Sequence, residues 1–199
     1  MCCRYRIEKT PRMTEIIEDL NRSPLLARWN EPVITEGEVR PGNVAPVIAT
    51  NRSGSISVFP MKWGFSGRSL LVNARSETAS QKPVFAQSWA SHRCIVPAAY
   101  YYEWEHTLTT DGKKRGGKKY KLAPQGGGMT WLCGLYRIEE GMPVFVVLTK
   151  EPWEGISFIH ERMPLIMPEK LIGSWVDPYA RPEELTGHAL AEMEYEAVV

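Results

Sequence analysis

The chain has 199 residues, of which 43% are hydrophobic and 24% are charged, so it is long enough for a single domain with a buried core. A formal net charge of only +1 excludes attraction of nucleic acid by bulk charge, so any such site must come from local clusters of basic residues. No stretch approaches the ~20 apolar residues of a membrane span, and no basic start leads into an apolar run. We therefore expect a cytoplasmic protein that does not bind membranes.

The first third of the chain is predicted to hold a strand, a helix, a loop and a second strand. Residues 1–6 (MCCRYR) are typical of a short strand. Thr10 and Pro11 supply an N-cap and a proline at the first helical position, and apolar residues then recur every three or four positions. The Pro- and Gly-rich residues 30–46 are predicted to be a surface loop, and residues 55–63 a strand.

The rest of the chain is predicted to mix strands with short helices. The aromatic and apolar run at 93–104 is predicted to be one strand, and the apolar residues 144–149 a central one. A basic, glycine-rich segment at 111–119 (DGKKRGGKK) is predicted to form a hairpin tip. Helices are predicted at residues 83–89, 168–176 and 182–190. This order, without repeated βαβ units, predicts an α+β fold: one domain over residues 1–199 with a mostly antiparallel, barrel-like sheet flanked by a few helices.

The four cysteines, at positions 2, 3, 94 and 133, give little sign of disulfides or metal binding. They form no CxxC pair, and the adjacent Cys2 and Cys3 cannot easily bond to each other. A reducing compartment fits this pattern better than a disulfide framework. Because paired ligands at regular spacing are missing, we expect no metal site and no other cofactor.

Cys2 is the residue with the most distinctive chemistry. If Met1 is removed, Cys2 presents a thiol beside an α-amine whose ordinary pKa of about 7.7–8.0 leaves part of it unprotonated at neutral pH. An amine adds to an aldehyde to give a Schiff base, and the neighbouring thiolate can close onto the same carbon to give a thiazolidine. Position alone favours a plainer interpretation, in which Cys2 is a small residue that permits removal of Met1.

Five short motifs, which follow one another along the chain, favour a chemical role for Cys2 over the plainer interpretation. They are MCCR at the start, NVAP at 43–46, LVNARSET at 71–78, YYEWE at 101–105 and FIHERMP at 158–164. Together they resemble the SRAP family, named for SOS-response-associated peptidases, from residue 2 to about residue 175. The resemblance implies the SRAP fold and a protein that senses abasic sites in single-stranded DNA. It further implies a lyase-like Schiff-base reaction that ends in a covalent thiazolidine DNA–protein crosslink and shields the lesion.

The resemblance also implies a role for each residue of the site. Cys2 forms the thiazolidine with the aldehyde of the opened sugar. Asn73 of the NAR motif holds the amino-terminal residue in place. Glu103 of the EW motif moves protons during Schiff-base formation, and His160 of the HER motif assists ring opening and proton transfer. The peptidase name reflects a proposed self-cleavage that exposes the same cysteine.

The residue types agree with these roles but leave alternatives open. Glu103 lies between Tyr102 and Trp104, and a partly buried carboxyl beside aromatic rings has a raised pKa that suits proton transfer. Without the resemblance, an exposed charge on a strand is as good an interpretation. His160 can act as an acid or a base near neutral pH, yet alone it is better interpreted as a structural or surface imidazole. Asn73 alone is typical of a turn or a helix cap.

Three arginines, Arg4, Arg75 and Arg162, lie within two residues of predicted catalytic positions. Guanidinium groups match phosphate geometry, so we expect them to hold the DNA backbone around the reacting sugar. The alternative is surface ion pairing, of Arg75 with Glu77 or of Arg162 with Glu161.

Two further DNA contacts are predicted. Trp104 is a candidate for stacking on a base, although a core position fits it equally well, whereas Trp63 is assigned to the core. Asn43 of the NVAP motif joins the predicted DNA-binding residues because of the resemblance. The predicted partner is therefore single-stranded DNA that contains an abasic site, and we expect a monomer.

The sequence departs from the family pattern at several points. Cys3 stands where relatives commonly have glycine, and Ala98-Ala99-Tyr100 replaces a small, acidic and glycine-containing pattern. The segment 65–72 is short where relatives often carry a longer aromatic loop. The chain stops without the tail and final strand usual in relatives, so we expect the family's carboxyl-terminal tail to be either truncated or disordered.

Three alternative functions remain. An N-terminal-cysteine autopeptidase or peptidase, a thiol-dependent hydrolase, uses the same residues but has no need for three arginines. A metal-binding module would use Cys2, Cys3 and either His160 or His92. A non-enzymatic nucleic-acid binder predicts only reversible, salt-sensitive complexes.

Overall fold

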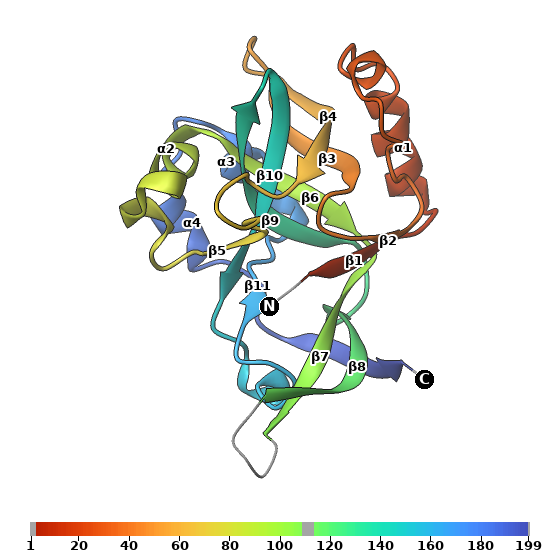
Figure 1. Ribbon diagram of the computed structural model, residues 1–199, viewed down its shortest axis with the longest axis vertical. Coiled ribbons are helices and arrows are strands. Elements are labelled where there is room, and N and C mark those ends of the chain that lie inside the picture. Colours follow the sequence, from red (N-terminus) through yellow and green to blue (C-terminus); the bar gives the residue numbers. More distant parts are fainter. Residues whose placement is uncertain (1–2, 109–113, 199) are drawn as a thin grey trace.

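Two β-sheets meet at the amino-terminal strand in the computed structural model, which describes residues 3–108 and 114–198, without the side chains of residues 107–116 (Figure 1). The first sheet has five strands in the order β12-β8-β7-β1-β2, and the second has seven. The strands are β1 (Arg4–Ile7), β2 (Gly37–Val39), β3 (Val44–Thr50), β4 (Ile56–Trp63), β5 (Asn73–Arg75), β6 (Arg93–Ala98), β7 (Tyr100–Leu108), β8 (Lys114–Pro124), β9 (Thr130–Glu139), β10 (Met142–Lys150), β11 (Met163–Pro164) and β12 (Met193–Val198).

The larger sheet closes into a five-stranded barrel. Strands β10, β4, β3, β6 and β9 follow one another, and β9 pairs again with β10. Among the described pairings between strands, β10 is parallel to β4 and β5, and the others are antiparallel. Strand β10 has four neighbouring strands, which confirms the central position predicted for residues 144–149. The predicted α+β fold with a mostly antiparallel, barrel-like sheet is confirmed.

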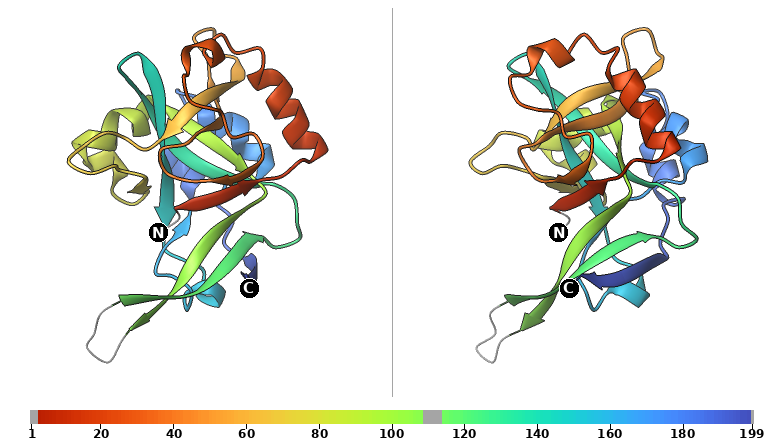
Figure 2. Two further views of the ribbon diagram at one scale, coloured as in Figure 1. Left: turned by 45° about the vertical axis from the view of Figure 1, so that its right-hand side comes forward. Right: turned by 90° about the vertical axis from the view of Figure 1, so that its right-hand side faces the viewer.

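Helices cover the outside of the barrel (Figures 1 and 2). They are α1 (Pro11–Leu20), α2 (Pro83–Ser91), α3 (Ile172–Val176) and α4 (Pro182–Thr186), with 3-10 turns at Leu26–Arg28, Ala79–Gln81, Glu154–Ile156 and Glu169–Leu171. The α1 helix begins as predicted: the Thr10 side chain accepts a hydrogen bond from the Met13 N–H at 3.1 Å. Of the described helices, none is long and apolar enough to cross a membrane.

One stretch of chain joins the two sheets. Strand β6 belongs to the barrel and β7 to the five-stranded sheet, and the chain changes sheets at Ala99. The Ala99 N–H donates to the Arg6 carbonyl at 2.8 Å, and the Thr130 hydroxyl donates to the Ala99 carbonyl at 2.9 Å. The single strand predicted over residues 93–104 is therefore wrong, because this run forms two strands in different sheets.

Aromatic side chains fill the space between the barrel and β1. Trp63 is fully buried, with its ring centroid 5.3 Å from that of Tyr5 and 5.9 Å from that of Phe145. Its Nε1–H donates to the Val72 carbonyl at 2.9 Å, so the one polar group of the ring is satisfied. The assignment of Trp63 to the core is confirmed.

Arg93 fixes the carboxyl-terminal helices to the barrel. This guanidinium is 1% exposed and donates to five backbone carbonyls, those of Trp89, Ala90, Trp175, Asp177 and Ala180. These acceptors lie at the end of α2 and around α3. Burial lowers the pKa of Arg93, and the nearby Asp177 and Glu183 carboxylates only partly oppose this.

Several predicted boundaries are wrong. Residues 30–46 are not one loop, because they contain β2 and the start of β3. The last predicted helix ends at Thr186 instead of residue 190. The last described strand, β12, pairs with β8 from Met193 to Val198. The truncation of the family's carboxyl-terminal tail stays a prediction. Residues 111–113 of the predicted hairpin tip lie outside the described residues, and β8 begins at Lys114.

Candidate active site beside the amino-terminal strand

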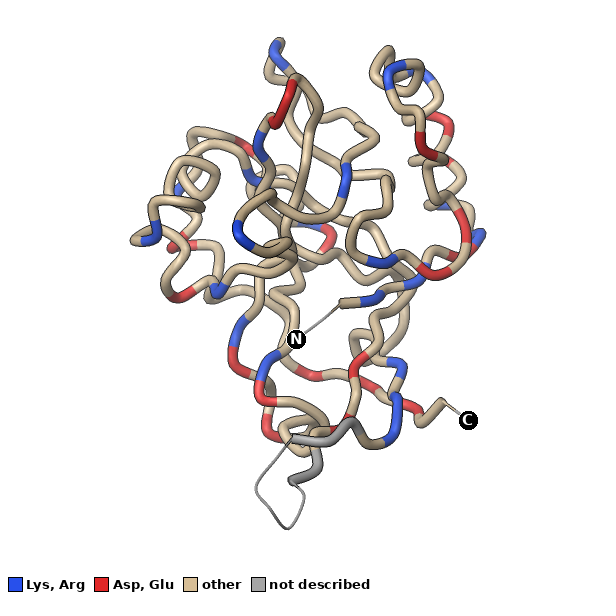
Figure 3. The backbone as a smooth tube through the Cα atoms, in the orientation of Figure 1, with Lys and Arg blue, Asp and Glu red and all other residues tan. Residues whose placement is uncertain are grey.

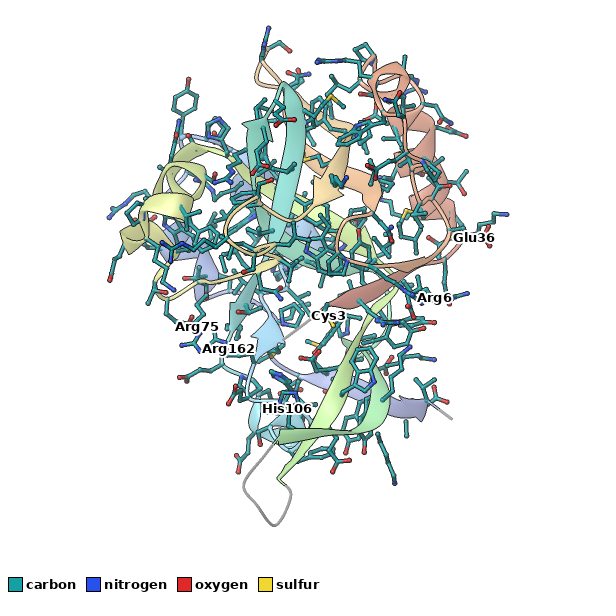
Figure 4. The ribbon with its side chains drawn as sticks, in the orientation of Figure 1. Cys3, Arg6, Glu36, Arg75, His106 and Arg162 are labelled. Carbon is teal, nitrogen blue, oxygen red and sulfur yellow. The ribbon has the colours of Figure 1, made fainter. Side chains whose placement is uncertain are left out.

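The predicted site residues gather where β1, β5, β7 and the segment before β11 approach one another. In Figure 4, Cys3 lies between Arg75 and Arg162 on one side and Arg6 on the other, with His106 below. Cys2 lies outside the described residues. Cys3, directly before β1, is half-buried, and its thiol pKa is raised by burial first and by the Glu103 carboxylate second.

Glu103 is buried in the five-stranded sheet. It lies on β7 opposite Tyr120 of β8, and only 2% of it is exposed. Burial disfavours the charged form and raises the pKa of this carboxyl to about 7. The alternative interpretation of Glu103 as an exposed strand charge is wrong. A carboxyl with this pKa can both accept and donate a proton near neutral pH.

His160 faces Glu103 and is held in one tautomer. Its Nδ1 accepts the Arg162 backbone N–H at 2.9 Å, so in the neutral ring the hydrogen is on Nε2. Nε2 lies 3.4 Å from Glu103 Oε1. The residue is 5% exposed, and burial lowers its pKa to about 4. The interpretation of His160 as a surface imidazole is wrong.

The two pKa values decide the charge state of the pair. His160 becomes a cation only near pH 4, where Glu103, with a pKa of about 7, is protonated. A carboxylate–imidazolium ion pair is therefore not the main form of this pair at any pH, despite the short distance. At neutral pH, the site presents a neutral imidazole that donates from Nε2 beside a carboxyl that is about half protonated.

Asn73 begins β5 and is positioned by the barrel. It pairs in parallel with Val147 of the central strand β10 and is partly buried. The preceding Val72 carbonyl is held by the Trp63 indole. The interpretation of Asn73 as a turn or capping residue is wrong, because it lies within a strand next to the site.

The arginines of the NAR and HER motifs differ in exposure. Arg162 is 9% exposed, and its Nη2 donates to Glu77 Oε2 at 2.7 Å and to the Thr149 carbonyl at 2.7 Å. Arg75 lies opposite Thr149 in the β5–β10 pair and is exposed. Within the described part of the chain, no carboxylate lies within 4.0 Å of the Arg75 guanidinium. Arg162 is thus paired with Glu77, and neither of the pairings considered from the sequence forms.

The remaining predicted DNA contacts lie on the other side of β1. Trp104 is half-buried rather than in the core, and the Arg4 guanidinium lies 5.3 Å from its ring centroid. Arg4 also donates to Glu38 Oε1 at 2.7 Å. Asn43 closes the turn before β3, because its Oδ1 accepts the Arg40 N–H at 3.0 Å. The Asn43 side-chain oxygen is therefore used locally.

The structure adds His106 to the site, a residue that sequence reasoning missed. Its ring centroid lies 4.1 Å from that of His160, and its backbone N–H donates to the Ile159 carbonyl at 3.1 Å. A register shift between Trp104 and His106 interrupts the alternation of β7. Simple alternation would place His106 on the Trp104 face, so the sequence pattern gave no signal for this contact.

A metal centre finds no support in the described part of the chain, where no three His, Cys, Asp or Glu side chains converge. His92, one of the ligands considered, lies at the end of α2, where its ring contacts Tyr136 with centroids 5.1 Å apart. Its Nδ1 lies 2.9 Å from the Ser91 hydroxyl. This imidazole belongs to a different part of the surface from His160.

The architecture is shared with solved structures. A protein from Bacteroides thetaiotaomicron has a TM-score of 0.75 at 19% identity, over 100% of this chain and 92% of that one. A phage-related protein from Bordetella bronchiseptica has a TM-score of 0.75 at 20% identity, over 99% of this chain and 94% of that one. At these identities the likeness establishes the class of fold alone.

Sequence comparison gives the family. The profile described as SOS response associated peptidase (SRAP) matches residues 1–199. The abasic site processing protein YoqW of Bacillus subtilis (strain 168) is 30% identical over 196 residues, which cover 89% of this chain and 81% of YoqW. The abasic site processing protein YedK of Escherichia coli (strain K12) is 25% identical over 206 residues, 97% of this chain and 85% of YedK. The chain belongs to the SRAP family, as its motifs predicted.

Proposed function

We propose that this protein processes abasic sites in DNA and that it captures them covalently, in single-stranded DNA, through the amine and thiol of Cys2. The observation that carries the proposal is the buried pair of Glu103 and His160 beside the strand that follows Cys2. Relatives named abasic site processing proteins support the choice of substrate.

The reaction balances without an oxidant or a metal. Removal of Met1 frees the α-amine of Cys2, which adds to the C1 aldehyde of the opened sugar and gives a carbinolamine. Loss of water gives an iminium ion, and the Cys2 thiolate adds to the same carbon to close the ring. One amine, one thiol and one aldehyde thus become one thiazolidine and one water.

Glu103 is suited to the proton transfers at the carbinolamine. Its carboxylate form accepts the proton that the attacking amine loses, and its protonated form donates a proton to the departing hydroxyl. A pKa of about 7 makes both forms abundant at neutral pH, which is the condition for a group that acts in both directions.

His160 is suited to opening the sugar. An abasic sugar is mostly a closed hemiacetal, and opening it requires a proton on the ring oxygen and loss of one from the C1 hydroxyl. The neutral ring can stabilise the ring oxygen by a hydrogen bond from Nε2, because Nδ1 is occupied by the Arg162 N–H, while the proton itself comes from an acid such as the protonated form of Glu103. The low pKa of His160 supports this assignment as a hydrogen-bond donor rather than a standing cation.

The residues that we propose to contact DNA differ in how exposed their side chains are. Exposed Arg75 on β5 and half-buried Arg4 on β1 are suited to phosphates of the strand that carries the sugar. Buried Arg162 is assigned to the same group only through its remaining side-chain donors, since its Nη2 already binds Glu77 and the Thr149 carbonyl and its backbone N–H binds His160. Trp104 and Asn43 complete the proposed interface, and Asn73 is proposed to hold the amino-terminal residue.

Intact mass of the purified protein tests the proposal. We expect the mature protein to begin at Cys2 and to gain, on mixing with single-stranded DNA bearing one abasic site, the mass of the oligonucleotide minus one water. Retention of Met1 in protein that still crosslinks would exclude the thiazolidine. Cleavage of a peptide panel without any adduct would favour the peptidase alternative.

A further inference from the structure

The outer face of the five-stranded sheet carries a cluster of three cations around one carboxylate. Glu38 of β2 accepts hydrogen bonds from Arg4 Nη1 at 2.7 Å and Arg40 Nε at 2.8 Å on Oε1, and from Lys119 Nζ at 3.2 Å on Oε2. These four residues, called the Glu38 cluster below, come from three strands and the turn after β2.

Sheet register explains why they meet. Tyr5 of β1 lies opposite Val39 and Tyr101, and all three side chains are buried toward the barrel. The alternate positions therefore point outward, among them Arg4 on β1 and Lys119 on β8. Lys119 lies opposite Trp104 of β7, so the cluster adjoins the Trp104 ring.

Within the cluster, positive charge exceeds negative charge. Although partial burial opposes ionisation, hydrogen bonds from Arg40, Lys119 and Arg4 lower the pKa of Glu38 to about 2. Three cations therefore share one carboxylate that stays ionised at neutral pH. The neighbouring cations on this face have carboxylates of their own, Glu8 for Arg6 at 3.2 Å and Glu196 for Lys121 at 2.9 Å.

The cations are held in place yet remain accessible. Lys119 Nζ lies 3.7 Å from the Tyr102 ring centroid and 5.4 Å from that of Trp104, and the Arg4 guanidinium lies 5.3 Å from the latter. Their side chains are still 24% and 33% exposed, and that of Arg40 is 61% exposed. An arginine has five N–H donors, and Arg40 reaches Glu38 through Nε, which leaves its two Nη groups turned to solvent or a ligand.

We propose that the Glu38 cluster binds the phosphodiester backbone of the DNA strand on one side of the lesion, with Glu38 as the residue that positions the three cations. This rests on the proposed function. Figure 4 places Cys3 between Arg75 on one side and Arg6, a neighbour of the cluster on β1, on the other. Blue segments also flank the start of β1 on both sides in Figure 3. A strand whose sugar reaches Cys2 would then pass Arg75 in one direction and the Glu38 cluster in the other.

The test is the double variant Arg40→Ala/Lys119→Ala, with Arg22→Ala/Arg181→Ala as the matched control. Both pairs remove two cations, but Arg22 and Arg181 lie beside α1 and α4, away from the five-stranded sheet. Binding of a fluorescent single-stranded oligonucleotide without an abasic site is measured by anisotropy over a range of salt concentrations. We expect the cluster variant to bind roughly tenfold more weakly, with a salt slope smaller by about 1.4, since each phosphate contact on a single strand contributes about 0.7.

Truncated oligonucleotides locate the contact. These carry a stable abasic analogue that has no aldehyde and cannot crosslink. With the strand cut short on one side of the analogue, the cluster variant and the wild type should bind equally; with the strand cut short on the other side, the tenfold difference should persist. Equal salt slopes for cluster variant, control and wild type would overturn the proposal, as would a deficit unaffected by either truncation. At saturating DNA the cluster variant should still crosslink fully, whereas failure of the wild-type protein to crosslink would instead refute the proposed function.

Discussion

Replacing Glu103 with glutamine keeps the shape of the side chain and removes its ability to ionise. The wild-type carboxyl has a pKa of about 7 in the folded protein against an ordinary 4.5, because it is 2% exposed. The folded state therefore binds this proton more tightly than the unfolded state. Its stabilising contribution is fully present below pH 4.5 and is lost as the pH rises through 7.

The size of the effect follows from the two pKa values. Each pH unit between them is worth about 1.4 kcal/mol, so raising the pH from 4.5 to above 7 costs the wild type about 3 kcal/mol at this residue. Glu103→Gln avoids that cost. The variant's free energy of unfolding, relative to wild type, should rise by about 3 kcal/mol across this interval.

His160 contributes the opposite trend and must be separated. Its pKa of about 4 lies below the ordinary 6.5, so its effect on stability also changes with pH, and its neutral form is the one that the folded state favours. That contribution is present above pH 6.5 and is lost as the pH falls through 4. In the wild type the two trends overlap between pH 4.5 and 6.5 and largely offset each other. Measuring Glu103→Gln also in a His160→Gln background isolates the carboxyl.

Urea unfolding followed by tryptophan fluorescence, at half-unit steps from pH 4.5 to 8, gives the difference curve. Glu194→Gln, at an exposed position, controls for the loss of one carboxylate. A Glu103→Gln difference that stays constant across pH in both backgrounds would refute the argument that burial keeps Glu103 protonated. The rate at which the same variant crosslinks abasic DNA should be lower by a factor of ~10²–10⁴, while the reaction still reaches a covalent product.

Three further predictions concern single residues. Cys2→Ala should abolish the stable DNA adduct on denaturing gels while Cys3→Ala keeps most of it; the reverse would mean that Cys3 is the reacting thiol. Arg75→Ala should weaken binding to single-stranded DNA and leave the urea midpoint unchanged, whereas Arg162→Ala should also lower the midpoint, because Arg162 holds the Thr149 carbonyl. Arg93→Met should destabilise the fold by about 3 kcal/mol, since five carbonyls lose their donor; a change below about 1 kcal/mol would mean that water replaces the guanidinium.

Local signals in the sequence were sufficient where structure depends on neighbours in the chain. The α1 helix carries its own N-cap and apolar face, and both are seen in the structure. The apolar run that forms β10 could be placed at the centre of the sheet because only a strand covered on both faces tolerates it.

Prolines misled the prediction for residues 30–46. Pro46 lies inside β3, directly opposite Pro60 of β4. Two directly opposed antiparallel residues either exchange both of their N–H bonds or neither, so a proline pair fits a position without bonds and costs no hydrogen bond between β3 and β4. Whether a proline is tolerated inside a strand therefore depends on the residue opposite it, and the sequence of that strand alone does not say which residue this is.

In the candidate site, too, some features follow from local sequence and others depend on how distant segments pack. The motifs predicted which residue types take part, but the distance between Glu103 and His160 depends on how the segment before β11 packs against β7. The bulge after Trp104 brings His106 against His160, and no glycine or proline in this segment predicts it. The burial that raises the pKa of Glu103 likewise comes from strands distant in sequence, such as β8.

The passage of β6 into β7 at Ala99 bears on how a nucleic acid can be accommodated. One uninterrupted stretch of backbone serves both sheets, and the Ala99 hydrogen bonds hold its bend, so we expect the two sheets to move little relative to each other at this junction. Under the proposed function, any bending in the complex would then have to come from the DNA. Duplex DNA is stiff over about 150 base pairs, and sharp bends in it cost several kcal/mol, whereas a single strand turns freely about each phosphate. Under the proposed function, a site that does not bend would favour flexible single-stranded DNA over stiff duplex DNA, independently of base sequence.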